Sequence, residues 1–180
     1  MDQALTHWIN SLAGSTVFLD FFMIGVTDIG VPVLIALVVV QWWSKTDRLH
    51  VRHSCVAAGL SFLTALAINQ CIILFVHRVR PYDAGISHLI VAKSTDWAFP
   101  SDHTTASVAV VTTFVLNGLP RRAISFAVLA MLISWSRIFV GTHYVTDVLG
   151  GCVTGVAGAM LVRMFYRKGS RLDSIATQIL

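Results

Sequence analysis

Residues 123–165, AISFAVLAMLISWSRIFVGTHYVTDVLGGCVTGVAGAMLVRMF, contain two long apolar runs joined by the short polar turn GTHYVTD. The runs, 123–140 and 145–165, each approach the roughly 20 residues that an α-helix needs to cross a bilayer. Lipid offers the backbone no hydrogen-bond partners, so such a segment must satisfy its own N–H and C=O groups as a helix. The stretch therefore predicts two antiparallel membrane helices with a polar turn at one membrane surface.

Four further apolar segments precede this pair, at 15–27, 31–43, 54–75 and 104–119. Gly30 and Pro32 predict a break between the first two, and Asp20 is costly inside a span. The sequence thus predicts an all-α integral membrane bundle of six transmembrane helices. The alternative is five, with the first segment re-entrant or interfacial. We expect residues 1–180 to form a single membrane-embedded domain, and residues 1–10 to begin it with a short interfacial helix.

The composition, with 56% hydrophobic and only 12% charged residues, agrees with this prediction. Most cations fall on one predicted side, which the positive-inside rule makes cytoplasmic together with the C-terminus: Lys45, Arg48, Arg52, Arg121, Arg122, Arg163, Arg167, Lys168 and Arg171. The opposite, outer side keeps Arg78, Arg80, Lys93 and Arg137, where the rule disfavours positive charge. These four predict an anionic ligand on that side, and the net charge of +4 does not call for a nucleic acid partner.

Three polar clusters fall at the outer ends of the predicted spans. Polar and charged side chains at membrane depth are costly unless they meet in one polar cavity, so we expect a shared pocket. Its arginines can bind phosphate oxygens bidentately, and its serines can add hydroxyl donors. The clusters are Arg80-Pro81, Pro100-Ser101-Asp102-His103, and Ser136-Arg137 with His143 and Asp147.

The two histidines suit different steps of a phosphoryl transfer, which needs a nucleophile and a proton donor for the leaving oxygen. Asp147 follows His143 by four residues, a spacing that on a helix puts the carboxylate beside the imidazole and fixes its tautomer. His143 is therefore the predicted nucleophile and His103 the predicted acid. No helix presents paired histidines at metal-ligand spacing, so we expect neither a metal nor another cofactor.

These motifs resemble the type 2 phosphatidic acid phosphatase superfamily of lipid phosphate phosphatases, whose signature is Lys-x6-Arg-Pro, Pro-Ser-Gly-His and Ser-Arg-x5-His-x3-Asp. Two positions depart from it: Ile73 replaces the family's lysine, and Asp102 replaces the glycine. Arg78 is a candidate substitute for the lysine. Asp102 either interacts with a second phosphate or caps the following helix. Both departures, with the stretch SRIFVGTHY, resemble undecaprenyl-diphosphate phosphatases of the bacitracin-resistance type.

The resemblance implies a metal-independent hydrolase in the plasma membrane, with its active site on the outer side. It would convert undecaprenyl diphosphate to undecaprenyl phosphate and inorganic phosphate through a phosphohistidine, recycling the carrier lipid of cell-wall synthesis. The implied substrate-binding residues are Arg78, Arg80, Ser101, Asp102, Ser136 and Arg137. The expected partners are this substrate and membrane lipids, and the sequence leaves the oligomeric state open.

Three alternatives remain open. The same site could act on phosphatidylglycerophosphate, phosphatidic acid or a lipid A phosphate, because catalytic residues hold the phosphate and not the lipid. A phosphotransferase would use the same residues with another acceptor. A non-catalytic lipid-phosphate-binding protein is the alternative from a different class, but it would not require Asp147 behind His143 or a second histidine.

Overall fold

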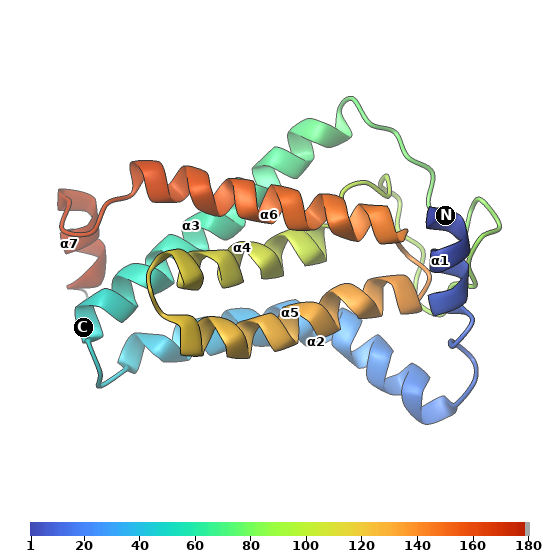
Figure 1. Cartoon of the computed structure of the whole chain (residues 1–180), viewed down its shortest axis with the longest axis horizontal. Coiled ribbons are helices and arrows are strands. Elements are labelled where there is room, and N and C mark those ends of the chain that lie inside the picture. The colour runs from blue at the N-terminus through green and yellow to red at the C-terminus, as the bar shows by residue number, and fades with distance from the viewer. Residues whose placement is uncertain (179–180) are drawn as a thin grey trace.

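The computed structural model describes residues 1–178, which form seven α-helices, one short 3₁₀ helix and no β-strand. Figure 1 shows α2 to α6 running along a common direction as an elongated bundle, with α1 and α7 lying across its opposite ends. The elements are α1 (Asp2–Asn10), α2 (Val17–Val40), η1 (Gln41–Trp43), α3 (Arg48–Ile73), α4 (Asp102–Leu116), α5 (Pro120–Phe139), α6 (Val145–Phe165) and α7 (Arg171–Thr177).

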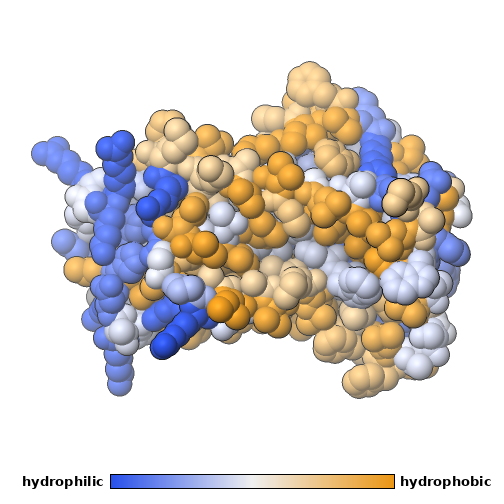
Figure 2. All heavy atoms as spheres, in the orientation of Figure 1, coloured by the Kyte–Doolittle hydropathy of each residue, from blue (hydrophilic) through white to orange (hydrophobic). Residues whose placement is uncertain are grey.

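Within residues 1–178, four helical segments are long and apolar enough to cross a membrane: 17–43, 48–73, 120–139 and 145–165. Apolar side chains cover the middle of the bundle and polar ones gather at its ends, most densely beside α7 (Figure 2). The shorter helix α4 packs against α3, α5 and α6. Its 15 residues start inside the bundle, which is why it is shorter than the spans around it. The described residues thus have the architecture of a multi-pass membrane protein.

The predicted break at Gly30 and Pro32 is wrong, because both residues lie inside the continuous helix α2. The six-span count is therefore not confirmed, since segments 15–27 and 31–43 form one helix. Gly30 serves packing: a Cβ there would lie 2.7 Å from Cγ1 of Ile133 in α5. Neighbouring helices allow membrane helices to tolerate proline. Asp20 lies in the first turn of α2 and accepts a hydrogen bond from the Gly14 N–H.

Glycines on α6 allow it to approach α4 closely. A Cβ at Gly151 would lie 2.7 Å from the carbonyl oxygen of Ser101, and one at Gly155 would lie 2.7 Å from that of Thr105. Small residues at such contacts are the usual means by which membrane helices pack. The Thr105 and Thr154 hydroxyls add a hydrogen bond of 2.9 Å across the same contact. This packing sets the distance between the first turns of α4 and α6.

Substitution of Gly155 by alanine is expected to destabilise the protein by about 1–3 kcal/mol, because a methyl group has no room against the α4 backbone. The measurement is the midpoint of thermal unfolding in detergent. Gly59→Ala in α3 is the matched control, since a Cβ there meets nothing within 4 Å. Equal midpoints for the two variants would contradict this account of the α4–α6 contact.

The long segment between α3 and α4 folds back over one end of the bundle. The Ala98 N–H donates to the Arg78 carbonyl at 2.9 Å, which aligns the start and the end of this segment. Asn10 of α1 holds its middle, donating to the carbonyls of His88 and Phe139 and accepting from the His88 N–H. These contacts bring the arginines after α3 to the turn between α5 and α6.

Candidate active site

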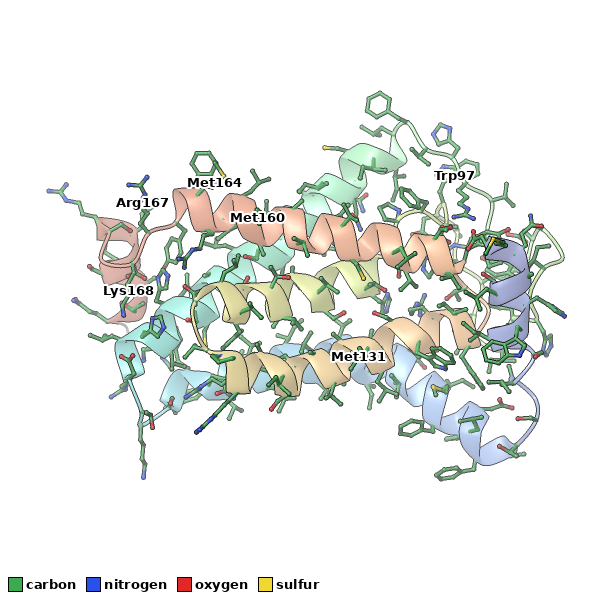
Figure 3. The ribbon with its side chains drawn as sticks, in the orientation of Figure 1. Trp97, Met131, Met160, Met164, Arg167 and Lys168 are labelled. Carbon is green, nitrogen blue, oxygen red and sulfur yellow. The ribbon has the colours of Figure 1, made fainter. Side chains whose placement is uncertain are left out.

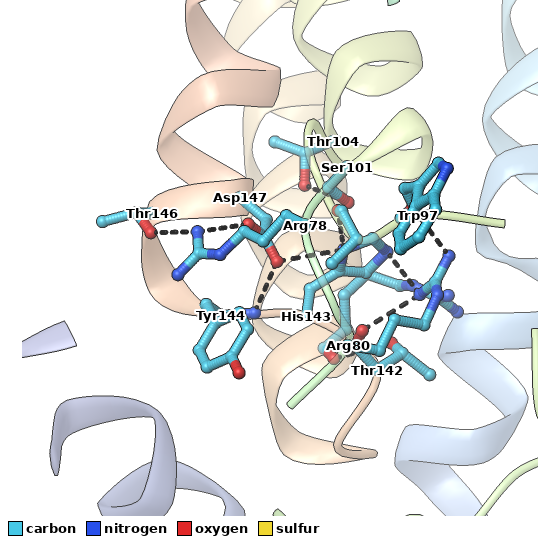
Figure 4. A network of polar contacts seen from close by, with 12 residues as sticks. Arg78, Arg80, Trp97, Ser101, Thr104, Thr142, His143, Tyr144, Thr146 and Asp147 are labelled. Atoms are coloured by element: carbon cyan, nitrogen blue, oxygen red, sulfur yellow. Dashed lines mark hydrogen bonds and ion pairs between the residues drawn. The ribbon is translucent and has the colours of Figure 1, made fainter. Parts of the chain in front are cut away.

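His143 lies in the turn between α5 and α6 and is buried. Its Nδ1 is 2.8 Å from the carbonyl oxygen of Ala98, and its Nε2 is 3.4 Å from Nη1 of Arg80 (Figure 4). A carbonyl can only accept, so Nδ1 carries the proton and donates to Ala98. In the neutral ring, Nε2 therefore keeps its lone pair and faces Arg80.

The surroundings of His143 keep its imidazole neutral. Burial lowers the pKa of His143 well below its ordinary value, and the positive charges of Arg137 and Arg80 act in the same direction. A neutral ring with a lone pair on Nε2 is the form that can attack phosphorus. As the predicted nucleophile, His143 in this form needs no base to remove a proton first.

Arg80 is buried and held in one orientation by the segment before α4. Its Nε donates to the Asp96 carbonyl oxygen at 3.0 Å, and its Nη2 donates to Oδ1 of Asp96 at 2.8 Å. Its Nη1 donates to the Thr142 carbonyl oxygen at 3.0 Å. Partial burial raises the pKa of Asp96, but the charge and hydrogen bond of Arg80 outweigh it and leave that pKa lowered. Asp96 is therefore the ionised partner that orients Arg80.

Arg137, near the end of α5, differs from Arg80 in its partners. Its side chain is buried, yet within residues 1–178 no hydrogen bond or ion pair engages it, and its Nε is buried without a partner. Burying a charge without pairing it is costly. Arg80 and His143 lie within electrostatic range of Arg137. So do three carboxylates that form no ion pair with it, those of Asp28, Asp96 and Asp102. This arrangement suits an anion that enters beside the imidazole.

The first turn of α4 brings the second predicted cluster to the same place. The Ser101 N–H donates to the Asp147 carbonyl at 3.1 Å, which joins the starts of α4 and α6. His103 lies within electrostatic range of His143 and Arg137. The free N–H groups of this first turn, at the positive end of the helix dipole, favour an anion.

Asp102 and Ser101 have protein partners in this structure. Oδ1 of Asp102 accepts a hydrogen bond of 2.6 Å from Nδ2 of Asn69 in α3, and the Ser101 hydroxyl accepts one of 3.3 Å from Thr104. The same Asn69 nitrogen donates to Thr105 at 2.8 Å. Asn69 therefore fixes the first turn of α4 against α3.

Asp147 contacts His143 less directly than its spacing predicts. Its Oδ2 lies 3.6 Å from Nδ1 of His143, farther than the Ala98 carbonyl, and accepts a hydrogen bond of 2.8 Å from the Tyr144 N–H. Its Oδ1 forms an ion pair of 2.5 Å with Arg78. The carbonyl of Ala98, and not Asp147, is thus the group that fixes the tautomer.

Arg78 is engaged away from Arg80. Besides Asp147, its guanidinium contacts Oδ2 of Asp2 at 2.6 Å and the Thr146 hydroxyl at 2.6 Å, and it lies 4.0 Å from the centre of the Tyr144 ring. In Figure 4 the guanidinium groups of Arg78 and Arg80 point to opposite sides of His143. The substitution of Arg78 for the family's lysine stays a prediction. In this structure the contacts of Arg78 are those of a residue that holds the carboxylate of Asp147.

Ser136 is also tied to the protein. Its hydroxyl donates to the Ile133 carbonyl at 2.7 Å and lies 2.8 Å from the Thr27 hydroxyl, which links α5 to α2. A role for Ser136 in substrate binding stays a prediction.

Sequence reasoning missed several residues of this site: Asp2, Asn69, Asp96 and the carbonyl of Ala98. Asp96 carried one available signal, a carboxylate in the same polar segment as two arginines. Asn69 carried another, an amide inside an apolar run. Within residues 1–178 no group of three or more His, Cys, Asp or Glu side chains is arranged to hold a metal ion.

The chain resembles known proteins in both sequence and structure. Residues 54–171 match the PAP2 superfamily. The chain is 31% identical over 161 residues to undecaprenyl-diphosphatase BcrC of Bacillus subtilis, covering 87% of this chain and 79% of that protein. It is 32% identical over 122 residues to phosphatidylglycerophosphatase B of Bacillus subtilis, covering 62% of this chain and 58% of that protein. The crystal structure of Aquifex aeolicus LpxE shares the fold, with a TM-score of 0.72, 20% identity and coverage of 91% of this chain and 95% of that one.

Proposed function

The chain belongs to the PAP2 superfamily, and on that basis we propose that it is a membrane lipid-phosphate phosphatase that hydrolyses undecaprenyl diphosphate to undecaprenyl phosphate and inorganic phosphate. The observation that carries the proposal is Arg137, a buried and unpaired cation within electrostatic range of His143. Asp28, Asp96 and Asp102 act on Arg137 without pairing with it. A phosphate group would give Arg137 a direct ion pair beside Nε2 of His143, which keeps a lone pair. The choice of lipid follows the similarity to BcrC.

In the proposed reaction Nε2 of His143 attacks the terminal phosphorus, and the bond from this phosphorus to the bridging oxygen breaks. Burial and the charge of Arg137 lower the pKa of His103 to about 3 in the free site, so His103 takes up its proton when the anionic substrate offsets the positive charges around it. It then gives this proton to the departing oxygen of undecaprenyl phosphate. Water then attacks the phosphohistidine, losing its proton to His103, which releases inorganic phosphate and restores both histidines. Arg80, Arg137 and the first turn of α4 stabilise the charge on the phosphoryl oxygens during both steps.

The groups around Nδ1 have a separate role in this mechanism. When Nε2 bonds to phosphorus the ring becomes cationic and retains the Nδ1 proton, which donates to Ala98 at 2.8 Å. The carboxylate of Asp147, at 3.6 Å, stabilises this cation. Arg78 and Asp2 hold that carboxylate in place. They are positioning residues, because neither contacts the imidazole.

Replacement of Arg78 by alanine is expected to lower kcat about 10- to 100-fold with little change in KM, because a misplaced Asp147 weakens only the charged intermediate. Arg78→Lys should restore part of the rate, since lysine keeps the charge but not the planar fork. Steady-state kinetics of both variants are the measurement. Lys93→Ala, at an exposed pair with Asp83, is the control. A rise in KM at constant kcat would instead assign Arg78 to the substrate phosphate.

We further propose that residues 1–180 act as one membrane-embedded domain, in the plasma membrane. The distribution of hydrophilic residues supports an active site on the outer face and a cytoplasmic C-terminus, because they gather most densely at the end where α7 lies (Figures 1 and 2). His143 lies in the turn between α5 and α6, at the opposite end. Metal independence belongs to the same proposal, since arginines and a helix N-terminus supply the positive charge.

The test is phosphate release by purified protein in detergent with a chelator present, comparing undecaprenyl diphosphate, phosphatidylglycerophosphate, phosphatidic acid and a lipid A phosphate. We expect the highest kcat/KM with undecaprenyl diphosphate. A preference for phosphatidylglycerophosphate would keep the mechanism and replace the substrate, as the similarity to phosphatidylglycerophosphatase B allows. No release from any of the four lipids would overturn the enzymatic function and favour a lipid-phosphate-binding protein.

A further inference from the structure

A polar cavity lies at the other end of the bundle, between α3, α4 and α6, and shares no residue with the candidate active site. Its volume is about 580 Å³, within the range of small-molecule sites. His50, His53 and Asn117 are among the residues of its wall, and Arg163, Arg167 and Lys168 lie at its mouth. Figure 3 shows Arg167 and Lys168 beside the connection from α6 to α7.

The lining of this cavity is basic. Three cations and two histidines line it, and none of its described lining residues is acidic. The nearby carboxylate of Asp173 is already engaged, because it accepts hydrogen bonds from His53 at 2.8 Å, from the Tyr166 hydroxyl at 2.7 Å and from the Gly169 N–H at 2.7 Å. The open charge of the cavity is therefore positive, which suits an anion.

His50 lines the cavity, but neither of its ring nitrogens is open to it. Its Nε2 is 2.8 Å from the carbonyl oxygen of Asn117, so Nε2 donates, while its Nδ1 is buried with no hydrogen-bond partner. An unsatisfied buried nitrogen is unusual. Because this nitrogen is enclosed by protein, a ligand in the cavity would be held by the exposed cations Arg163, Arg167 and Lys168 and not by Nδ1 of His50.

An apolar groove adjoins the basic cavity on the lipid-facing side of α6. It has a volume of about 410 Å³, and Val162 and Tyr166 line both spaces. Its other walls include Leu161 and Phe165, which are 41% and 81% exposed. A space lined by cations thus lies beside an apolar space that fits a hydrocarbon chain, with Val162 and Tyr166 as their common wall.

We propose that this end of the protein binds an anionic phospholipid, with the phosphate of the headgroup in the basic cavity and an acyl chain in the adjoining groove. Surface cations alone would attract any anion without fixing it. A cation-lined cavity next to an apolar groove matches both halves of a lipid molecule, which favours a lipid over a free phosphate compound. The site would hold a lipid of the leaflet at this end, separately from the substrate handled at His143.

The experiment is lipid retention by the purified full chain in detergent, measured by native mass spectrometry with phosphatidylglycerol and phosphatidylcholine of identical acyl chains. We expect retention of phosphatidylglycerol over phosphatidylcholine. In the double variant Arg163→Gln, Arg167→Gln, retention of phosphatidylglycerol should fall about 10- to 30-fold. The matched control is Arg121→Gln, Arg171→Gln, which removes two cations that do not line the cavity. An equal fall in phosphatidylglycerol retention in the control variant would show that the effect comes from the overall surface charge, and it would overturn the proposal.

A second pair of measurements separates a lipid from free phosphate. Leu161→Asn places a polar amide in the apolar groove and should lower retention of phosphatidylglycerol. It should not change any protection against thermal unfolding that inorganic phosphate gives the protein. Protection by inorganic phosphate that is lost in Arg163→Gln, Arg167→Gln, together with unaltered lipid retention in Leu161→Asn, would assign the cavity to a soluble phosphate compound and overturn the lipid. Unchanged phosphatase activity of these variants would show that they are folded.

Discussion

Replacement of His143 by alanine is expected to reduce phosphate release on the order of 10⁵-fold with every lipid substrate, since it removes the group that forms the covalent bond in the proposed mechanism. The imidazole is buried, its Nδ1 is committed to Ala98, and its Nε2 faces Arg80. Steady-state phosphate release measures the loss. Rapid quenching of the native enzyme with labelled lipid phosphate should also trap a label that is stable in base and lost in acid, as a phosphohistidine is.

The control for this prediction is His88→Ala, because His88 makes its contacts with α1 through its backbone. We expect that variant to keep near-native activity and labelling. Residual activity of His143→Ala within tenfold of the native enzyme, or a covalent label that survives in it, would assign the nucleophile to another residue.

Replacement of His103 by alanine is expected to affect the substrates unequally, because a general acid matters most for a poor leaving group. Phosphatidic acid releases an alkoxide, and we expect a loss of about 10³- to 10⁴-fold with it. Undecaprenyl diphosphate releases a phosphate monoester, a far better leaving group, so its loss should be smaller by at least about tenfold. The measurement is the kcat of the variant divided by the kcat of the native enzyme, determined for each lipid and then compared between the two lipids.

An activated aryl phosphate gives this prediction an internal control, since its phenolate departs without a proton. His103→Ala should retain the largest share of its rate with that compound. Equal losses with all three substrates would show that His103 acts by binding the phosphate and not by giving a proton to the leaving oxygen.

Much of the helical framework follows from local sequence. The predicted span 145–165 has the bounds of α6, and 123–140 differs from α5 by a few residues. Long apolar runs in lipid have few alternatives to a helix. The break at Gly30 and Pro32 is the error, because the rule that glycine and proline end helices describes helices in water. Here Gly30 packs against Ile133 and α2 continues.

The sequence by itself determined that the arginines and histidines at one end of the spans belong together, because their cost in lipid falls only when they meet in one place. It could not say which polar group contacts which. Spacing along the chain suggested Asp147 as the nearest partner of His143. In the tertiary structure the Ala98 carbonyl is the nearest partner of its Nδ1, and Asp147 contacts the Tyr144 N–H and Arg78.

Only the tertiary structure also decided that Arg80 is paired while Arg137 is left unpaired, and that a basic cavity adjoins an apolar groove at the far end. The physical reason is the same in each case. Hydrophobicity acts residue by residue and is readable along the chain, whereas a hydrogen bond or an ion pair depends on distances of a few ångströms between segments far apart in sequence, which only helix packing and loop paths set.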